Sequence, residues 1–133
     1  MNHKILEEDI MDMVMDHYDN PRNYGKLENP DIVQNGGNPG CGDSLTIYMK
    51  IDDNDVVVDA AFDGKGCIIS QSTSSMLTEY IKGRKVSEIT ELDTEFLKEL
   101  IGKDIIIRRP QCSRLALDTI RYGLRNYKKK QKN

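Results

Sequence analysis

Two stretches of strand-like residues joined by a tight turn constrain the fold of this chain most strongly. Residues 45–51 alternate apolar and polar side chains, which predicts a strand with one buried face. Residues 56–62 predict a second strand, and Asp52-Asp53-Asn54-Asp55 before it is typical of a turn. Because the connection is short, the two strands are expected to pair as an antiparallel hairpin. A further short strand is expected at Ile32 and Val33.

Apolar residues at helical spacing predict helices over much of the remaining chain. The expected helices cover residues 5–18, the segment from Cys67 to Gly83, a short turn at 86–89, residues 96–101 up to Gly102, and a last helix through 117–127. The three isoleucines at 105–107, ended by Pro110, predict a brief extended run instead. Strands followed by a series of helices indicate an α+β fold rather than an alternating α/β fold.

Length and charge exclude several classes of protein. A chain of 133 residues has the length of one domain, and we expect a single domain over residues 1–133. A net charge of −3 and the absence of Trp disfavour nucleic-acid binding. No apolar run reaches the ~18 residues that a membrane helix needs, and the acidic first ten residues do not fit a signal peptide. We therefore expect a cytoplasmic protein with neither a nucleic-acid nor a membrane partner.

Basic residues gather at the end of the last predicted helix, where no acidic residue accompanies them. They are Arg121, Arg125, Lys128, Lys129, Lys130 and Lys132. Cations there complement the negative end of the helix dipole. Docking of an acidic protein partner is the alternative interpretation.

The three cysteines are the strongest candidates for chemistry. An odd number excludes a closed disulfide framework, and no pair forms a CxxC motif. Cys41 and Cys67 lie in glycine-rich stretches, while Cys67 and Cys112 each fall at the predicted start of a helix. The positive end of a helix dipole favours thiolate, so we expect lowered pKa values for Cys67 and Cys112. The residues alone leave two interpretations open, a shared thiolate site or unrelated turn and buried cysteines.

Other polar residues near the cysteines have structural and functional interpretations. Asp43 is either a turn or strand-start acid or an oxygen ligand that completes a tetrahedral Cys₃Asp site. His3 and His17 are expected to be structural, and Gln111 is expected to be a hydrogen-bonding loop residue. The hydroxyl-rich residues 70–75 are expected to lie on a helix surface and to allow close helix packing.

Four segments together resemble the IscU/SufU/NifU N-terminal family of iron–sulfur cluster assembly scaffolds. The segment from His17 to Gly25 is similar to the family's HYxNPRNxG element. The three cysteine elements PxCGD, GxGC and CSxLA match residues 38–43, 64–67 and 112–116 in the family's order. The resemblance extends over nearly the whole chain.

The resemblance implies a SufE/NifU-like fold, with a small three-stranded antiparallel sheet and helices packed on one face. It implies that Cys41, Asp43, Cys67 and Cys112 hold a cluster, commonly [2Fe–2S], with iron supplied at the scaffold and zinc able to take the same site. A cysteine desulfurase would supply sulfur and apo-proteins would receive the cluster. Two copies of the chain could share one cluster.

Two departures from the family pattern affect the expected partners and function. Residues 105–110 read IIIRRP where chaperone-dependent members carry LPPVK, so binding of the dedicated Hsp70-type chaperone is not expected. Those members also have His directly before the third cysteine; Gln111 stands there in this chain, so a histidine ligand is not available at that position. SufU proteins carry an insertion between the second and third cysteines, for which the spacing of 45 positions leaves no room. We expect a scaffold rather than a turnover enzyme. The alternatives are a SufU-like zinc-dependent sulfurtransferase relay and a structural zinc protein.

Overall fold

A three-stranded antiparallel sheet forms one layer of the protein. The computed structural model describes residues 7–38 and 42–131. Strands β1 (Ile32–Asn38), β2 (Asp43–Ile51) and β3 (Val57–Lys65) lie in the order β1-β2-β3. The β2–β3 hairpin is confirmed, and its turn is closed by the Asp52 carboxylate, which accepts hydrogen bonds from the backbone of Asn54 (2.9 Å) and Val56 (3.0 Å).

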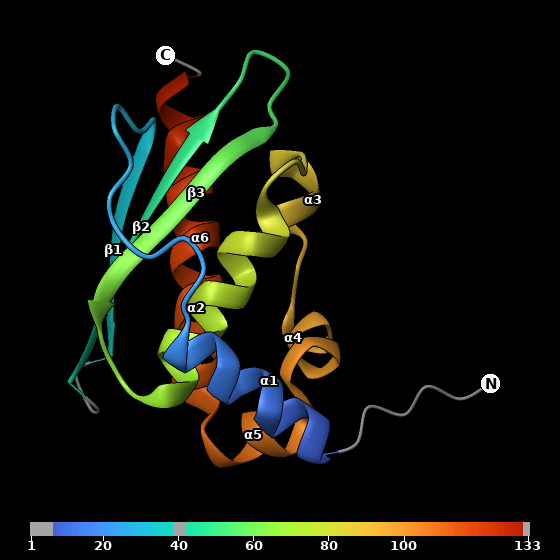
Figure 1. The fold of residues 1–133 in the computed structure, drawn as a ribbon. Coiled ribbons are helices and arrows are strands. Elements are labelled where there is room, and N and C mark those ends of the chain that lie inside the picture. The colour runs from blue at the N-terminus through green and yellow to red at the C-terminus, as the bar shows by residue number, and fades with distance from the viewer. Residues whose placement is uncertain (1–6, 39–41, 132–133) are drawn as a thin grey trace.

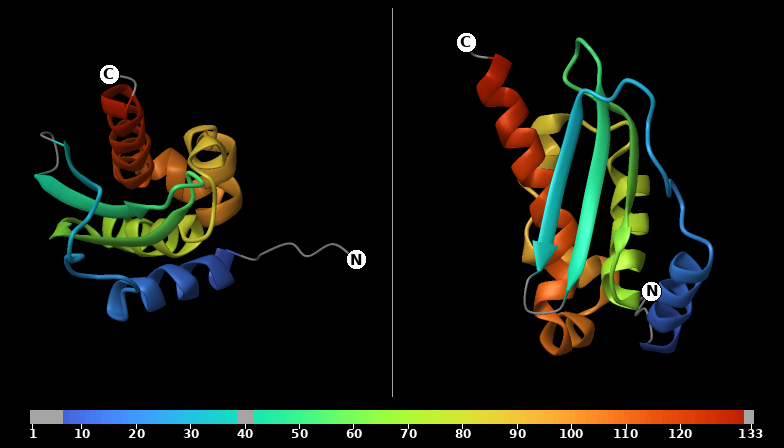
Figure 2. Two further views of the ribbon diagram at one scale, coloured as in Figure 1. Left: turned by 90° about the horizontal axis from the view of Figure 1, so that it is seen from above. Right: turned by 90° about the vertical axis from the view of Figure 1, so that its left-hand side faces the viewer.

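Helices form the second layer. They are α1 (Glu7–Asp19), α2 (Ile68–Ile81), α3 (Val86–Thr90), α4 (Thr94–Ile101), α5 (Lys103–Arg108) and α6 (Pro110–Gln131). Helices α2 and α6 lie side by side against the sheet, α6 over β1 and β2 and α2 over β3, and α1 packs on α2 (Figures 1 and 2). The α+β fold with helices on one face of a three-stranded antiparallel sheet is confirmed. Within the described ranges, no helix combines the length and apolar character needed to cross a membrane.

Strand β1 is longer than the sequence predicts, because it continues through two glycines. Gly36 pairs with Leu45 of β2. A Cβ atom at Gly36 would overlap the Thr119 hydroxyl of α6. Glycine therefore lets the strand pass directly under the helix, which brings the end of β1 and the start of β2 beneath the first half of α6.

The extended run expected at residues 105–107 is wrong, because these residues belong to helix α5. Gly102, at φ +86°, ends α4 and begins α5. Ile106 is buried, whereas Ile107 is 65% exposed, so the run presents one side to the core as a helix does. Packing of that side overrides the extended preference of β-branched residues. Pro110 then begins α6, a position in which its missing N–H costs no helical hydrogen bond.

The segment after α1 ties that helix to α2 and β3. The Ser75 hydroxyl of α2 lies 2.7 Å from His17 Nδ1 and accepts a hydrogen bond from the Arg22 backbone N–H at 2.8 Å. The backbones of Asn23 and Gly25 hydrogen-bond to Phe62 of β3 at 3.0 and 2.8 Å. The structural role expected for His17 is therefore confirmed, whereas His3 lies outside the described residues.

Helix α2 is surrounded by other elements, which explains its small hydroxyl side chains. Its serines and threonines are buried, so the expectation of a helix surface is wrong and that of close packing is confirmed. Ser72 donates to the Val14 carbonyl of α1 at 2.7 Å, and Ser74 donates to the carbonyl one turn earlier in its own helix at 2.7 Å. Small side chains that bond to backbone let α1 approach α2 closely.

Candidate metal site

Three of the four expected ligand residues converge at one end of the sheet. One donor atom each of Asp43, Cys67 and Cys112 lies within 4.8 Å of the other two. They come from the first residue of β2, the residue before α2 and the first turn of α6. Cys41, the fourth expected ligand, lies outside the described residues. The three described residues meet through the fold rather than through a local spacing.

Helix termini position the two described cysteines, as their sequence setting predicts. Cys67 is the N-cap of α2 with extended backbone (φ −71°, ψ 172°), and its Sγ accepts from the Ser70 backbone N–H at 3.5 Å. Cys112 is the third residue of α6, behind Pro110. It is only 2% exposed, whereas Cys67 is half-buried. The site thus has one buried thiol and one partly exposed thiol.

Asp43 occupies the centre of the cluster. It is 7% exposed, and its Oδ2 accepts hydrogen bonds from the Ser70 hydroxyl at 3.1 Å and from the Cys112 thiol at 3.4 Å. A carboxylate at a solvent-facing turn would have no reason to be buried, because desolvating a charge without partners is costly. Both the burial and the partners of Asp43 favour its interpretation as a site residue over that of a turn acid.

Gly66 leaves the space that the carboxylate occupies. A Cβ atom there would overlap the Ser70 hydroxyl and lie 3.2 Å from Asp43 Cγ. The glycine before Cys67 therefore lets Asp43, Ser70 and the start of α2 pack together. This is a steric requirement of the site itself.

The pKa of Cys112 does not follow the sequence expectation. Burial, followed by the neighbouring Cys67 and Asp43, raises the pKa of this thiol to about 12. The helix start, which favours thiolate, is outweighed by desolvation and by the neighbouring Cys67 and Asp43. The lowered pKa expected for Cys112 is wrong, and the expectation for Cys67 stays a prediction.

The donor set suits a thiophilic metal. Thiolate and carboxylate are both ligands of zinc, and thiolates are the usual ligands of iron–sulfur clusters. The described residues supply two sulfur donors and one oxygen donor around one point. Such a set accommodates zinc or iron.

Comparison with known proteins assigns the chain to a family. The model of the NifU-like N-terminal domain matches residues 9–133. The chain belongs to this family. The NifU-like domain thus includes every described residue of the site, together with the segments that tie α1 to α2.

Relatives of this NifU-like protein carry names from cluster assembly. It is 40% identical over 119 residues to "Iron-sulfur cluster assembly scaffold protein IscU 1" of Archaeoglobus fulgidus, covering 90% of this chain and 76% of the relative. It is 40% identical over 122 residues to "Iron-sulfur cluster assembly enzyme IscU" of Drosophila melanogaster, covering 89% and 77%. The crystal structure of a putative SUF-system scaffold protein, SufU, from Fervidobacterium islandicum aligns with a TM-score of 0.72 at 30% identity, covering 84% and 93%.

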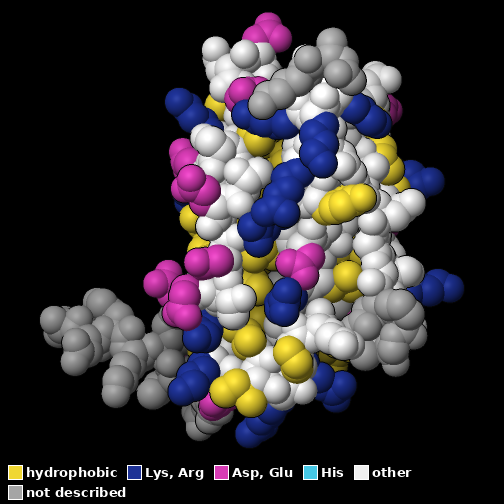
Figure 3. All heavy atoms as spheres, turned by 180° about the vertical axis from the view of Figure 1, so that it is seen from behind, with side chains coloured by type: hydrophobic (Ala, Val, Ile, Leu, Met, Phe, Trp, Pro, Cys, Tyr) yellow, Lys and Arg dark blue, Asp and Glu magenta, His cyan; other side chains and the backbone are white. Residues whose placement is uncertain are grey.

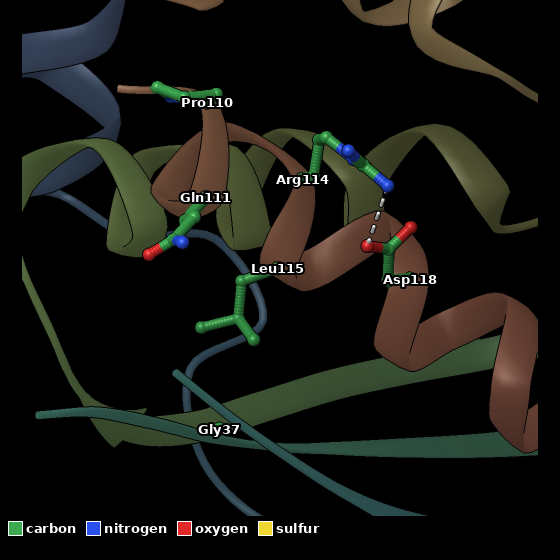
Figure 4. A pocket seen from close by; sticks show the side chains of 6 residues that line it. All are labelled: Gly37, Pro110, Gln111, Arg114, Leu115 and Asp118. Atoms are coloured by element: carbon green, nitrogen blue, oxygen red, sulfur yellow. Dashed lines mark ion pairs between the residues drawn. The ribbon is translucent and has the colours of Figure 1, made fainter. Parts of the chain in front are cut away.

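A hollow adjoins the cysteine site of the NifU-like domain. Its volume is about 300 Å³, and it lies between the end of β1 and the first half of α6 (Figure 4). Its lining residues are Gly37, Pro110, Gln111, Arg114, Leu115 and Asp118. The Arg114–Asp118 ion pair, at 3.7 Å, forms part of its wall. Gln111, expected in a loop, is a helical residue of this wall, so the loop expectation is wrong.

The basic end of α6 in this NifU-like protein is partly used within the molecule. Lys128 lies 3.6 Å from Asp55 of the hairpin turn, and Arg121 donates to the Thr90 carbonyl at 3.2 Å. Lys and Arg side chains gather near this end of the molecule on the face in Figure 3. The position of Lys128, Lys129 and Lys130 in the last turn of α6 fits the helix-dipole interpretation. Docking of an acidic partner stays a prediction.

Sequence reasoning did not single out Ser70 as a site residue. A signal was present, because the third residue after a helix N-cap faces back toward the cap. The direction of its hydroxyl toward Asp43 depends on a residue 27 positions earlier in the chain, which the local pattern does not reveal.

Proposed function

We propose that this protein is a scaffold on which an iron–sulfur cluster is assembled and from which the cluster passes to apo-proteins. The proposed ligands are Cys41, Asp43, Cys67 and Cys112. The observation that carries the proposal is the convergence of Asp43, Cys67 and Cys112 donor atoms within 4.8 Å. The names of the relatives, scaffold proteins of cluster assembly, support the same function.

The chemistry of the donor set fits temporary holding of a cluster. Thiolates are soft ligands that retain iron, whereas a carboxylate is a harder ligand that gives way more readily to an incoming thiolate. Cys67 is half-buried, so iron and sulfur can approach the site on its side. Cys112 is buried and would hold the metal from the interior. A site with both properties can accept iron and sulfide and later release them as a cluster.

The cargo proposed for this site is a [2Fe–2S] cluster built from ferrous iron and sulfur. A cysteine desulfurase is the proposed sulfur donor. Each persulfide sulfur takes up two electrons to become sulfide, so assembly also needs an electron donor. Zinc is proposed to take the same ligands when no cluster is present, and two copies of the chain could share one cluster.

The remaining features of the proposal follow from the sequence. The scaffold is proposed to be one domain over residues 1–133, to work in the cytoplasm and to act without turnover of a small molecule. Without the LPPVK element before the third cysteine, it is proposed to work without the dedicated Hsp70-type chaperone.

A zinc-dependent sulfurtransferase relay is the second candidate function. The structural similarity to SufU and a donor set that suits zinc favour it. The spacing between Cys67 and Cys112 disfavours it, because it leaves no room for the SufU insertion. Metal and sulfide analysis separates the two functions, since a relay would keep zinc and accept sulfur without binding iron.

Anaerobic reconstitution tests the proposed function. The protein is incubated with ferrous iron, cysteine, a cysteine desulfurase and a thiol reductant as electron donor, and visible absorption, iron and acid-labile sulfide are measured. We expect charge-transfer bands and about equal amounts of iron and sulfide. The control is a variant with all three cysteines changed to serine. If the control bound as much iron and as much sulfide as the wild type, the scaffold function would be refuted.

A further inference from the structure

One hydroxyl group lies between two of the proposed ligands. Ser70 Oγ is 3.1 Å from Asp43 Oδ2, 3.2 Å from the Cys67 carbonyl oxygen and 3.7 Å from Cys67 Sγ. Its backbone N–H also donates to Cys67 Sγ at 3.5 Å. The side chain is 4% exposed, so no bulk water competes for these contacts. Ser70 therefore contacts the carboxylate and one of the thiols at once.

Four other hydroxyls of α2 make hydrogen bonds of a different kind. Ser72 donates to a backbone carbonyl of α1, and Ser74 and Thr78 donate to carbonyls one turn earlier in α2. Ser75 contacts the His17 ring and the Arg22 backbone. Ser70 differs because its hydroxyl reaches the carboxylate of a proposed metal ligand. Packing of the helices alone does not require that contact.

We propose that Ser70 is a positioning residue of the metal site, and this inference rests on the proposed function. Its hydroxyl holds the Asp43 carboxylate in the orientation in which Oδ2 faces Cys67 and Cys112. Gly66 leaves room for this contact, because a Cβ atom there would overlap the Ser70 hydroxyl and lie only 3.2 Å from Asp43 Cγ. Ser70 acts through Asp43 and is not itself a ligand.

The physical basis is the cost of ordering a ligand. A carboxylate without a second hydrogen-bond partner rotates about its side-chain torsions, and metal binding must then restrict that rotation. A hydrogen-bond partner that is not itself a ligand already restricts this rotation in the metal-free protein, so metal binding loses less entropy. Loss of such partners typically weakens metal binding 10–100-fold. Cys112 also donates to Oδ2, but it loses that proton when it becomes a thiolate ligand. Ser70 keeps its proton, so it is the donor that remains when metal is bound.

Cobalt binding tests this inference without any assembly assay. Metal-free wild type, Ser70→Ala, Asp43→Ala and the double variant are titrated with Co²⁺, and zinc affinity is obtained by competition. Ser74→Ala is the matched control, since Ser74 is also buried on the same helix and donates to a backbone carbonyl. Circular dichroism confirms that each variant is folded.

We expect Ser70→Ala to weaken cobalt and zinc binding about 10–100-fold and to change the d–d bands in the same direction as Asp43→Ala. In the Asp43→Ala background, Ser70→Ala should change the affinity less than about twofold, because its target is gone. Ser74→Ala should bind as the wild type does.

Two results would overturn the positioning role while leaving the metal site intact. One is wild-type affinity and d–d bands in Ser70→Ala, and the other is an undiminished effect of Ser70→Ala in the Asp43→Ala background. The second result would make Ser70 a helix-capping residue that acts through Cys67. Absence of thiolate-to-cobalt charge-transfer bands in the wild type would instead refute the metal site and, with it, both proposals.

Discussion

The thiol of Cys112 donates a hydrogen bond to Asp43 Oδ2 at 3.4 Å, although 69 positions separate the two residues in the chain. This contact joins the start of β2 to the first turn of α6. In the metal-free site, a proton therefore lies between the Cys112 sulfur and the Asp43 carboxylate, two groups that would both be anionic when they bind a metal. A proton held in this way must leave when metal binds, because a coordinating cysteine is a thiolate.

We expect metal binding to release a full proton from Cys112 at neutral pH. Burial, Cys67 and Asp43 raise the pKa of this thiol to about 12, so it is protonated in the metal-free protein at pH 7. Below that pKa, metal affinity should rise with pH, by up to about tenfold per unit for each proton released. Calorimetry of zinc binding in buffers with different ionisation enthalpies counts the protons. Cys112→Ala should release about one proton fewer than the wild type, and an equal count would show that Cys112 is no ligand.

Gly66→Ala is expected to disrupt the site more than the fold. The added methyl group would overlap the Ser70 hydroxyl and lie too close to Asp43. It would therefore displace the Asp43 carboxylate from its place beside the two thiols. We expect at least a tenfold loss of zinc affinity, comparable to removal of a partner that orients a ligand. Competition with a chromophoric chelator measures the affinity.

Gly83→Ala is the matched control for this substitution. Gly83 follows α2 at φ +85° with no atom near a Cβ position, so alanine there causes only backbone strain. Its expected effect is a stability loss of about 1–2 kcal/mol with unchanged zinc affinity. Similar zinc affinities in the two variants would contradict a steric role for Gly66 in the site.

Features with a local cause were predictable from the sequence, and those that depend on distant contacts were not. The hairpin follows from alternation at 45–51, and the ends of α2 and α4 follow from Gly83 and Gly102, each at positive φ. Helix α5 was not predictable from residues 105–107, because burial of Ile106 against the core decides its conformation.

The candidate site shows the same division. The positions of Cys67 and Cys112 at helix starts were predictable, since capping and proline signals are local. The raised pKa of Cys112 was not, because it depends on burial and on Asp43, which the fold brings from another element. The contact of Ser70 with Asp43 was unpredictable for the same reason.

His17 is expected to make the protein less stable in mild acid. Burial, and then the charge of Arg22, lower the pKa of His17 in the folded protein. The unfolded chain has a histidine pKa near ~6.5. Around and below this pH, His17 therefore binds a proton more readily in the unfolded chain than in the folded protein. The contribution of neutral His17 to stability is fully present above pH ~6.5 and is lost as pH falls below that value, by at most about 1.4 kcal/mol per unit.

Urea unfolding at pH 7.5 and pH 5.5 measures this effect. His17→Gln keeps a hydrogen-bonding group near Ser75 but cannot take up the proton. We expect the free energy of unfolding to fall more between the two pH values in the wild type than in the variant. An equal fall in both proteins would assign the acid sensitivity to other groups.

Asp43→Ala is expected to retain an assembled cluster longer than the wild type and to transfer it more slowly. A carboxylate is a hard donor beside soft thiolates, so it is the ligand most readily displaced by a thiolate of an incoming acceptor. In the variant an added thiol can fill the vacant position and hold the iron more firmly. Transfer to an apo-acceptor is followed by circular dichroism in the visible range, with the Cys67→Ser variant expected to lose its cluster.

A purely structural role of Asp43 would instead give a modest stability loss of about 1 kcal/mol and unchanged transfer. Transfer from Asp43→Ala that equals or exceeds the wild-type rate would therefore remove the carboxylate from the release step.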